Sequence, residues 1–129
     1  MTTTHPFGLP SATPFGFSTS TLDKLNSVFT RHSAIDSVVI YGSRAKGNYR
    51  AGSDIDLTIK GSEIPFEELM QIEDQIDDLM LPYTVDLSQY RLLENADLIV
   101  HIDRVGKEIY AKDGGRNTAT AENLARVKV

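Results

Sequence analysis

The stretch of sequence that most constrains the fold runs from residue 38 to residue 59 and reads VVIYGSRAKGNYRAGSDIDLTI. Its two apolar runs, at 38–41 and 54–59, are rich in β-branched and aromatic residues and are separated by Gly, Ser and Asn, a pattern that predicts two strands. Side chains alternate between the two faces of a strand, so Asp54 and Asp56 share one face of the second run. The apolar residues that alternate with them should pack in the core.

Two carboxylates on the same face of one strand lie about 7 Å apart along it. Like charges at this separation oppose each other's ionisation unless a positive charge lies between them. Hard divalent cations such as Mg²⁺ bind carboxylate oxygens and substrate phosphates together. Asp54 and Asp56 therefore predict a divalent metal site.

A third strand is expected at 83–87, YTVDL, where apolar residues alternate with Asp86. Aspartate is depleted inside strands, so Asp86 repeats the anomaly of the preceding strand. If the two strands are neighbours, Asp54, Asp56 and Asp86 converge on one exposed face. The sequence thus offers three carboxylates as metal ligands and catalytic residues.

Apolar residues at helical spacing predict helices over 19–31, 66–80 and 94–110. The helix over 66–80 has an acidic face without a basic residue, which is usually a solvated face and alternatively docks a basic partner. His32, at the end of one apolar stripe, is interpreted as a helix-end residue, and His101, beside another, as a packing or surface residue.

With the first strand extended to 35–41, these elements predict an α/β (α+β) domain with a small mixed three-stranded sheet and helices packed on one side. The expected domain covers 18–112. Residues 1–17 are rich in Thr, Pro and Gly and predict a flexible leader, and residues 113–129 predict a polar C-terminal tail.

Composition narrows the function classes. The net charge of −5 argues against a surface that coats nucleic acid, so no direct nucleic-acid binding is expected. The absence of cysteine excludes disulfides and thiolate metal sites. No apolar run approaches the length of a membrane span, and no signal-peptide pattern opens the chain. A cytoplasmic protein without a membrane partner is expected.

The turn after the first strand shares only part of two known phosphate-binding motifs. Gly42 and Gly47 have the spacing of a P-loop, but the Lys and Ser or Thr that should follow are missing, and no G-x-G-x-x-G occurs. The Gly-Ser turn itself offers backbone N–H groups and the Ser43 hydroxyl to an anion. Arg44 and Lys46 add positive charge. We therefore expect Gly42, Ser43, Arg44 and Lys46 to bind a phosphate-containing ligand.

An anion-binding turn together with three carboxylates suits two-metal phosphoryl transfer, in which two ions about 4 Å apart activate the attacking oxygen and stabilise the leaving one. Asp54 and Asp56 would bridge the two ions. Asp86 would hold the ion on the acceptor side and help to take the proton from the acceptor hydroxyl.

Gly42-Ser43, ten residues, Asp54-x-Asp56 and a later isolated Asp86 on a strand together resemble the DNA polymerase β-type nucleotidyltransferase superfamily. The string GSRAKGNYRAGSDIDL closely resembles its minimal stand-alone branch, the MNT proteins. The resemblance covers about residues 17–110. It implies a polymerase β-like fold, two Mg²⁺ ions, ATP as donor, and transfer of a nucleotidyl group to a hydroxyl with loss of pyrophosphate.

The resemblance also implies a partner. Minimal members are commonly paired with a small helical HEPN protein, and in several pairs the MNT protein is an antitoxin that adds AMP to a tyrosine of the HEPN toxin. Two alternatives stay open. One is transfer to a small hydroxylated molecule with a separate substrate-binding subunit, and the other is a non-catalytic antitoxin that masks its partner.

Overall fold

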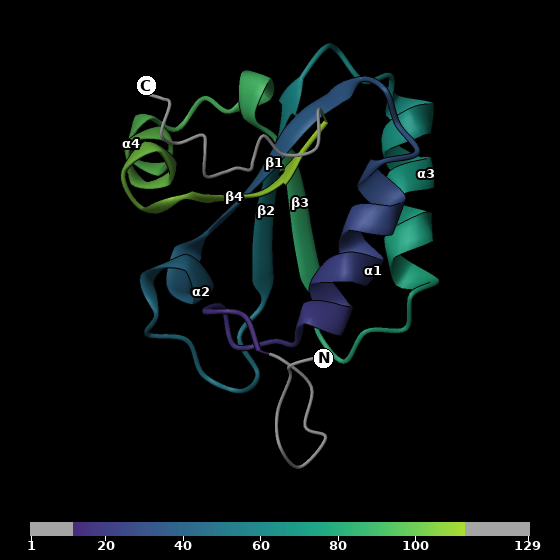
Figure 1. Cartoon of the computed structure of the whole chain (residues 1–129). Helices are drawn as coiled ribbons and strands as arrows, with labels where there is room; N and C mark the ends of the chain where they lie inside the picture. Colours follow the sequence, from purple (N-terminus) through teal and green to yellow (C-terminus); the bar gives the residue numbers. More distant parts are fainter. Residues whose placement is uncertain (1–11, 113–129) are drawn as a thin grey trace, which may run out of the picture.

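The computed structural model describes residues 12–112, which form a four-stranded mixed sheet in the order β3-β2-β1-β4 (Figure 1). Strand β1 pairs antiparallel with both β2 and β4, and β2 pairs parallel with β3. In chain order the elements are α1 (Thr19–Phe29), β1 (Ile35–Tyr41), α2 (Gly42–Lys46), β2 (Ile55–Gly61), α3 (Phe66–Asp77), β3 (Val85–Gln89), the 3₁₀ turn η1 (Tyr90–Leu92), α4 (Ala96–Val105) and β4 (Lys107–Ala111).

The expectation of three strands is wrong, because the C-terminal part of the predicted last helix is the strand β4. Helix α4 ends at Val105, and Gly106 has extended backbone dihedrals of φ −61° and ψ 146°. A Cβ at Gly106 would collide with the Ile102 carbonyl and with Val39, so glycine permits this sharp exit. Ile109 follows Ile102 by seven residues, a spacing that also fits a helical stripe, which is why the sequence pattern concealed the strand.

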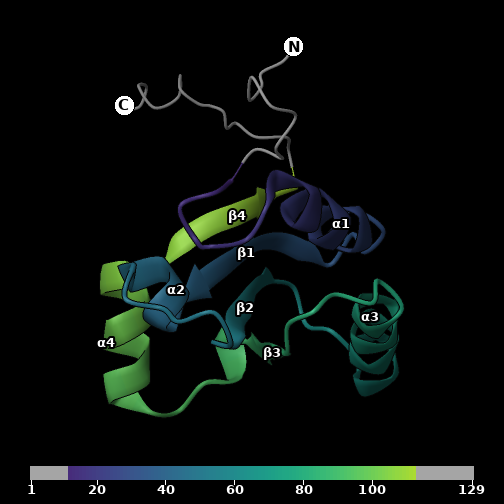
Figure 2. The same cartoon turned by 90° about the horizontal axis from the view of Figure 1, so that it is seen from below.

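The expectation that all helices pack on one side is also wrong. Helices α1 and α3 cover one face of the sheet, whereas α4 lies on the opposite side (Figures 1 and 2). Val38 and Ile40 join the main core under α1 and α3, while Val39 and Tyr41 pack with Ile102 of α4. Strand β1 is therefore buried on both faces, as its unbroken run of apolar residues allows.

Helix α1 begins where Ser18 caps it, since the Ser18 hydroxyl accepts the Thr21 N–H at 3.1 Å. The segment before the cap is packed as well, with Phe15 and Phe17 in the main core. The part of the predicted leader at 12–17 thus lies against the domain. Its first eleven residues and the predicted tail at 113–129 lie outside the described residues.

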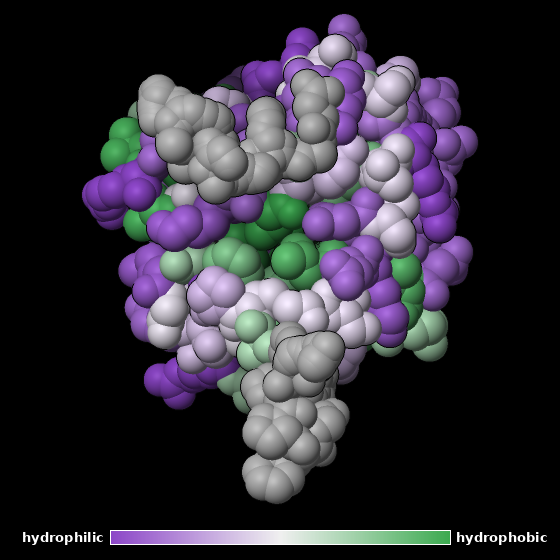
Figure 3. Space-filling model, in the orientation of Figure 1, coloured by the Kyte–Doolittle hydropathy of each residue, from purple (hydrophilic) through white to green (hydrophobic). Residues whose placement is uncertain are grey.

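The surface seen in Figure 3 is mostly polar, with apolar side chains gathered near its centre between α1 and α2. Across residues 12–112, no helix combines the length and the apolar character needed to span a membrane.

Candidate active site

The carboxylates of Asp56 and Asp86 meet at one register position of the sheet. Asp56 of β2 is paired with Asp86 of the parallel strand β3 on one side and with Tyr41, the last residue of β1, on the other. Neighbouring strands lie about 5 Å apart, so the three side chains form a row across the sheet on the face that carries α4. The structure thus brings together two carboxylates that are far apart in the sequence.

The surroundings of Asp56 in this row disfavour the ionised form of its carboxyl group. Burial raises the pKa of Asp56 above its ordinary value of 3.8, and the charges of Asp86 and Asp54 raise it further. A carboxyl group held in this way is stabilised in its ionised form by a cation nearby. The surroundings of Asp56 therefore disfavour its ionised form.

Asp54 lies immediately before β2 and is exposed, whereas Asp56 is half-buried. The negative charge of Asp54 contributes to the raised pKa of Asp56. Within the described ranges, however, no group of three or more His, Cys, Asp or Glu side chains surrounds a common metal position. Asp56 and Asp86 are adjacent hard oxygen donors and fit a divalent ion as a pair. The three-carboxylate metal site remains a prediction.

A hydrogen bond between two hydroxyl groups joins the strands that carry Asp56 and Asp86. The Ser88 hydroxyl donates to Thr58 Oγ1 at 2.9 Å, and these residues occupy the next register position on the same face. Thr58 is fully buried, so this bond links β2 and β3 in the interior. It fixes the relation between the two strands that carry Asp56 and Asp86.

The Gly-Ser turn lies directly against Asp56. Gly42 follows β1 with a φ of +74°, a conformation that favours glycine. A Cβ at this position would collide with Oδ2 of Asp56, so glycine is required for space as well. Ser43 follows in the first turn of α2. The turn and the carboxylates thus form one continuous site.

One backbone N–H of this turn already has a partner. The Gly42 N–H donates to Nε2 of His101 at 3.1 Å. This differs from the expectation that the N–H groups of the turn are free for an anion. His101 and Tyr41 are the two site residues that sequence reasoning missed, and only the packing of α4 onto β1 could reveal them.

Arg44 is the residue whose position differs most from its expected role in nucleotide binding. Its side chain is only 1% exposed. The guanidinium donates to the carbonyls of Phe15 at 2.8 Å and of Ser53 at 2.9 and 3.1 Å. It also contacts the rings of Phe17, Tyr49 and Tyr83, with distances to the ring centroids of 5.8, 5.2 and 4.8 Å.

These contacts place the charge of Arg44 in the interior, where it joins the segment before α1 to the loop that leads to Asp54. Lys46, at the end of α2, is exposed. Of the two predicted cations, Lys46 is therefore the one that a phosphate in solution can reach.

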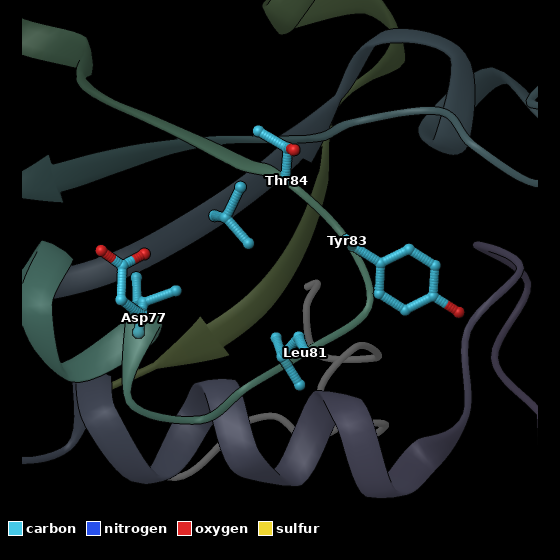
Figure 4. Close-up of a pocket in the computed structure, with 6 residues that line it drawn as sticks. Asp77, Leu81, Tyr83 and Thr84 are labelled. Atoms are coloured by element: carbon cyan, nitrogen blue, oxygen red, sulfur yellow. The ribbon is translucent and has the colours of Figure 1, made fainter.

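A cavity of about 220 Å³ lies between the end of α3 and the start of β3, with Asp77, Leu81, Tyr83 and Thr84 among its lining residues (Figure 4). Val85 contributes to it from the sheet face that packs on α1 and α3, opposite to Asp86. The cavity is therefore separate from the carboxylate row.

Two register-matched carboxylates beside a glycine turn and a serine hydroxyl are typical of enzymes that transfer phosphate-containing groups. Residues 23–114 match the sequence model of the family described as Polymerase beta, Nucleotidyltransferase. The chain belongs to this family and is a nucleotidyltransferase. The family predicted from the Gly-Ser and Asp-x-Asp pattern is thus confirmed.

Several solved structures with a similar fold are structures of toxin–antitoxin proteins. A chain in the crystal structure of a toxin–antitoxin with AMP-PNP has a TM-score of 0.58 and 17% identity, over 83% of this chain and 82% of that chain. A chain of the MntA–HepT toxin–antitoxin has a TM-score of 0.55 and 14% identity, over 86% and 82%. At these identities the likeness concerns the fold.

A third similar chain comes from the structure of a tri-AMPylated Shewanella oneidensis HEPN toxin in complex with MNT antitoxin. It has a TM-score of 0.54 and 12% identity, over 85% of this chain and 86% of that chain. No curated protein matches this chain.

Proposed function

We propose that this protein is a Mg²⁺-dependent nucleotidyltransferase that moves AMP from ATP to a tyrosine hydroxyl of a HEPN toxin and thereby acts as its antitoxin. The observation that carries the proposal is the shared register of Asp56 and Asp86 directly beside the Gly42 turn. Carboxylates and a phosphate-binding turn are thereby adjacent, as transfer from a triphosphate requires.

In this proposal Asp54, Asp56 and Asp86 would hold the Mg²⁺ ions, and bound Mg²⁺ would neutralise negative charge on the phosphates. The pKa of Asp56, raised chiefly by burial and further by Asp86 and Asp54, supports a cation at this position, since a cation stabilises the ionised carboxylate. The Ser43 hydroxyl donates to a phosphate oxygen, and Lys46 supplies a mobile positive charge.

Asp86 is the carboxylate best placed to meet an acceptor. It is exposed on β3, which is the edge strand of the sheet, whereas Asp56 is enclosed between β1 and β3. An acceptor hydroxyl can therefore approach Asp86 from solvent and donate its proton to the carboxylate as it attacks. Asp86 is accordingly proposed as the general base.

The identity of the acceptor rests on the toxin–antitoxin proteins that share the fold. One was solved with AMP-PNP, and another comes from the complex of a tri-AMPylated HEPN toxin with MNT antitoxin. These findings favour ATP as donor and a HEPN protein as acceptor for this chain.

The test is label transfer in an extract of the source cells, with Mg²⁺ and ATP labelled at either the α or the γ phosphate. We expect an α-labelled protein band that requires Asp86 and disappears with EDTA, and its size identifies the partner. Asp86→Asn is compared with Asp74→Asn, which removes an exposed charge from α3 and should transfer normally.

Other outcomes would contradict parts of the proposal. A γ-labelled band would indicate kinase-like chemistry. An α-labelled small molecule without a labelled protein would indicate a small-molecule nucleotidyltransferase. Transfer from neither label, with a partner still bound, would indicate an antitoxin that works by masking.

A further inference from the structure

His101 joins α4 to the turn between β1 and α2. Its Nε2 accepts the N–H of Gly42 at 3.1 Å, across 59 positions of sequence. Its ring also meets the ring of Tyr41 edge to face, with centroids 6.1 Å apart and an interplanar angle of 80°. Helix α4 therefore contacts both the last residue of β1 and the first residue of α2 through one side chain.

The hydrogen bond fixes the chemical state of the imidazole. Because Nε2 accepts, it carries a lone pair, and the proton of the neutral ring lies on Nδ1. The bond also satisfies a backbone donor at a half-buried position, where an unpaired N–H would cost free energy. His101 thus stabilises one orientation of the Gly42 peptide.

The orientation of this peptide determines where the neighbouring groups of the site lie. Gly42 has a positive φ and is in close contact with Asp56, so the turn has little room to shift toward the carboxylate. Ser43 is the next residue in the chain. A rotation of the Gly42 peptide would move the Ser43 hydroxyl relative to Asp56.

We propose that His101 is a positioning residue of the nucleotidyl transfer site, which holds the Gly42–Ser43 turn in its phosphate-binding arrangement by accepting the Gly42 N–H. This inference rests on the proposed function for the identity of the substrate. The role requires the acceptor atom on α4 and is distinct from ring packing against Tyr41.

Two substitutions separate the acceptor from the ring. His101→Phe keeps an aromatic ring against Tyr41 and removes the acceptor. His101→Gln removes the ring and places an amide oxygen near the position of Nε2. Val100→Ala changes the exposed neighbour on the same helix and serves as the control.

The hydrogen bond itself is observable without substrate. In the wild-type protein labelled with nitrogen-15, a scalar coupling across the bond should connect the Gly42 amide nitrogen to His101 Nε2, and the ring should show the shifts of the Nδ1–H tautomer. Absence of this coupling in a folded protein would overturn the inference, whatever the transfer assay shows.

The kinetic test uses the rate of α-label transfer at varied ATP concentration. Groups that support a ligating residue typically contribute 10–100-fold, so His101→Phe should raise the KM for ATP by about 10-fold, with a smaller effect on kcat. His101→Gln should restore most of this loss, and Val100→Ala should behave as wild type. Equal losses in the Phe and Gln variants, or wild-type kinetics in the Phe variant, would overturn the inference.

The two proposals fail in different ways. If the wild-type protein transfers no label to any acceptor, the proposed function fails. The inference is then decided by the coupling and by AMP-PNP affinity, which His101→Phe should weaken about 10-fold and His101→Gln should largely retain. If transfer occurs but is indifferent to His101→Phe, the inference alone fails.

Discussion

Asp56 and Asp86 occupy the same register position of the parallel strands β2 and β3, so two carboxylates face each other across neighbouring strands. Such a pair is destabilising for the apo protein because like charges directly opposite repel. The arrangement persists because the Thr58–Ser88 hydroxyl bond and the apolar opposite face hold the strands together. The site is thus a place where the fold accepts an electrostatic cost that a cation can relieve.

Replacing Asp56 by Asn should separate activity from stability. Loss of a group that only hydrogen-bonds to a metal ligand typically lowers metal affinity or activity by about 10–100-fold. Loss of a proposed ligand itself should therefore lower kcat/KM by about 100-fold or more. Loss of the repelling charge should leave the free energy of unfolding unchanged or increased. Urea unfolding in EDTA and α-label transfer in Mg²⁺ measure the two effects. An active or unfolded variant would show that Asp56 has another role.

The contribution of Asp56 to the stability of the apo protein should fall as pH rises just above the ordinary carboxyl pKa. The pKa of Asp56 is raised above 3.8 in the folded state, chiefly by burial, so the folded protein keeps this proton to higher pH than the unfolded chain. Between the two pKa values the unfolded state binds fewer protons, and the free energy of unfolding decreases with pH.

The decrease in the free energy of unfolding is complete above the raised pKa of Asp56. The Asp56→Asn variant should not show this decrease. Urea unfolding in EDTA over a series of pH values, with wild type and variant side by side, measures the difference. Mg²⁺ should raise wild-type stability most at the high-pH end of this window, since it binds the ionised form. Parallel pH profiles for the two proteins would contradict the assignment.

The carboxylates could be predicted from the sequence because strand alternation is a local property. Asp54 and Asp56 fall on one face by spacing alone, and Asp86 repeats the pattern in a second strand. The pairing of β2 with β3 follows from the crossover through α3, which favours parallel neighbours. For these reasons the fold family and the carboxylate face were accessible from the sequence.

The contacts of Arg44 and His101 could not be predicted in this way, because both depend on segments distant in sequence. Arg44 binds a carbonyl of the segment before α1, and His101 reaches Gly42 only because α4 packs on the second face of β1. Strand β4 was concealed for a related reason, since the spacing of Ile109 fits a helix as well as a strand. Tertiary packing decided all three.

Arg44→Lys should destabilise the protein, because an ammonium group cannot reproduce the planar fork of donors that binds the carbonyls of Phe15 and Ser53. Arg44→Ala should cost about 3 kcal/mol or more, since several charge-assisted hydrogen bonds are lost and buried carbonyls are left unpaired. Lys46→Ala, at an exposed cation of the same helix, should change stability little.

Urea unfolding of the three variants tests this interpretation of Arg44. If Arg44 instead binds nucleotide directly, Arg44→Lys would raise the KM for ATP without lowering stability. That result would restore the role expected from the sequence and would contradict the interior role of the guanidinium.

Gly42→Ala should impair both stability and transfer, and Gly47→Ala is its matched control. Both glycines have a positive φ, +74° and +92°, so each alanine carries the left-handed strain of about 1–2 kcal/mol. A Cβ at Gly47 meets open space, whereas one at Gly42 meets the Asp56 carboxylate. Gly47→Ala should therefore show the strain alone and keep its transfer activity.

The additional cost at Gly42 should depend on the carboxylate that the new methyl group meets. In a double-mutant cycle, Gly42→Ala and Asp56→Ala should together destabilise less than the sum of the single changes, because the second substitution removes the colliding group. The same cycle with Gly47→Ala should be additive. Urea unfolding of the wild type and the five variants in EDTA gives both coupling energies. Additivity at Gly42 would mean that the turn moves away freely from Asp56, and the close packing of turn and carboxylate would then not be a constraint on the site.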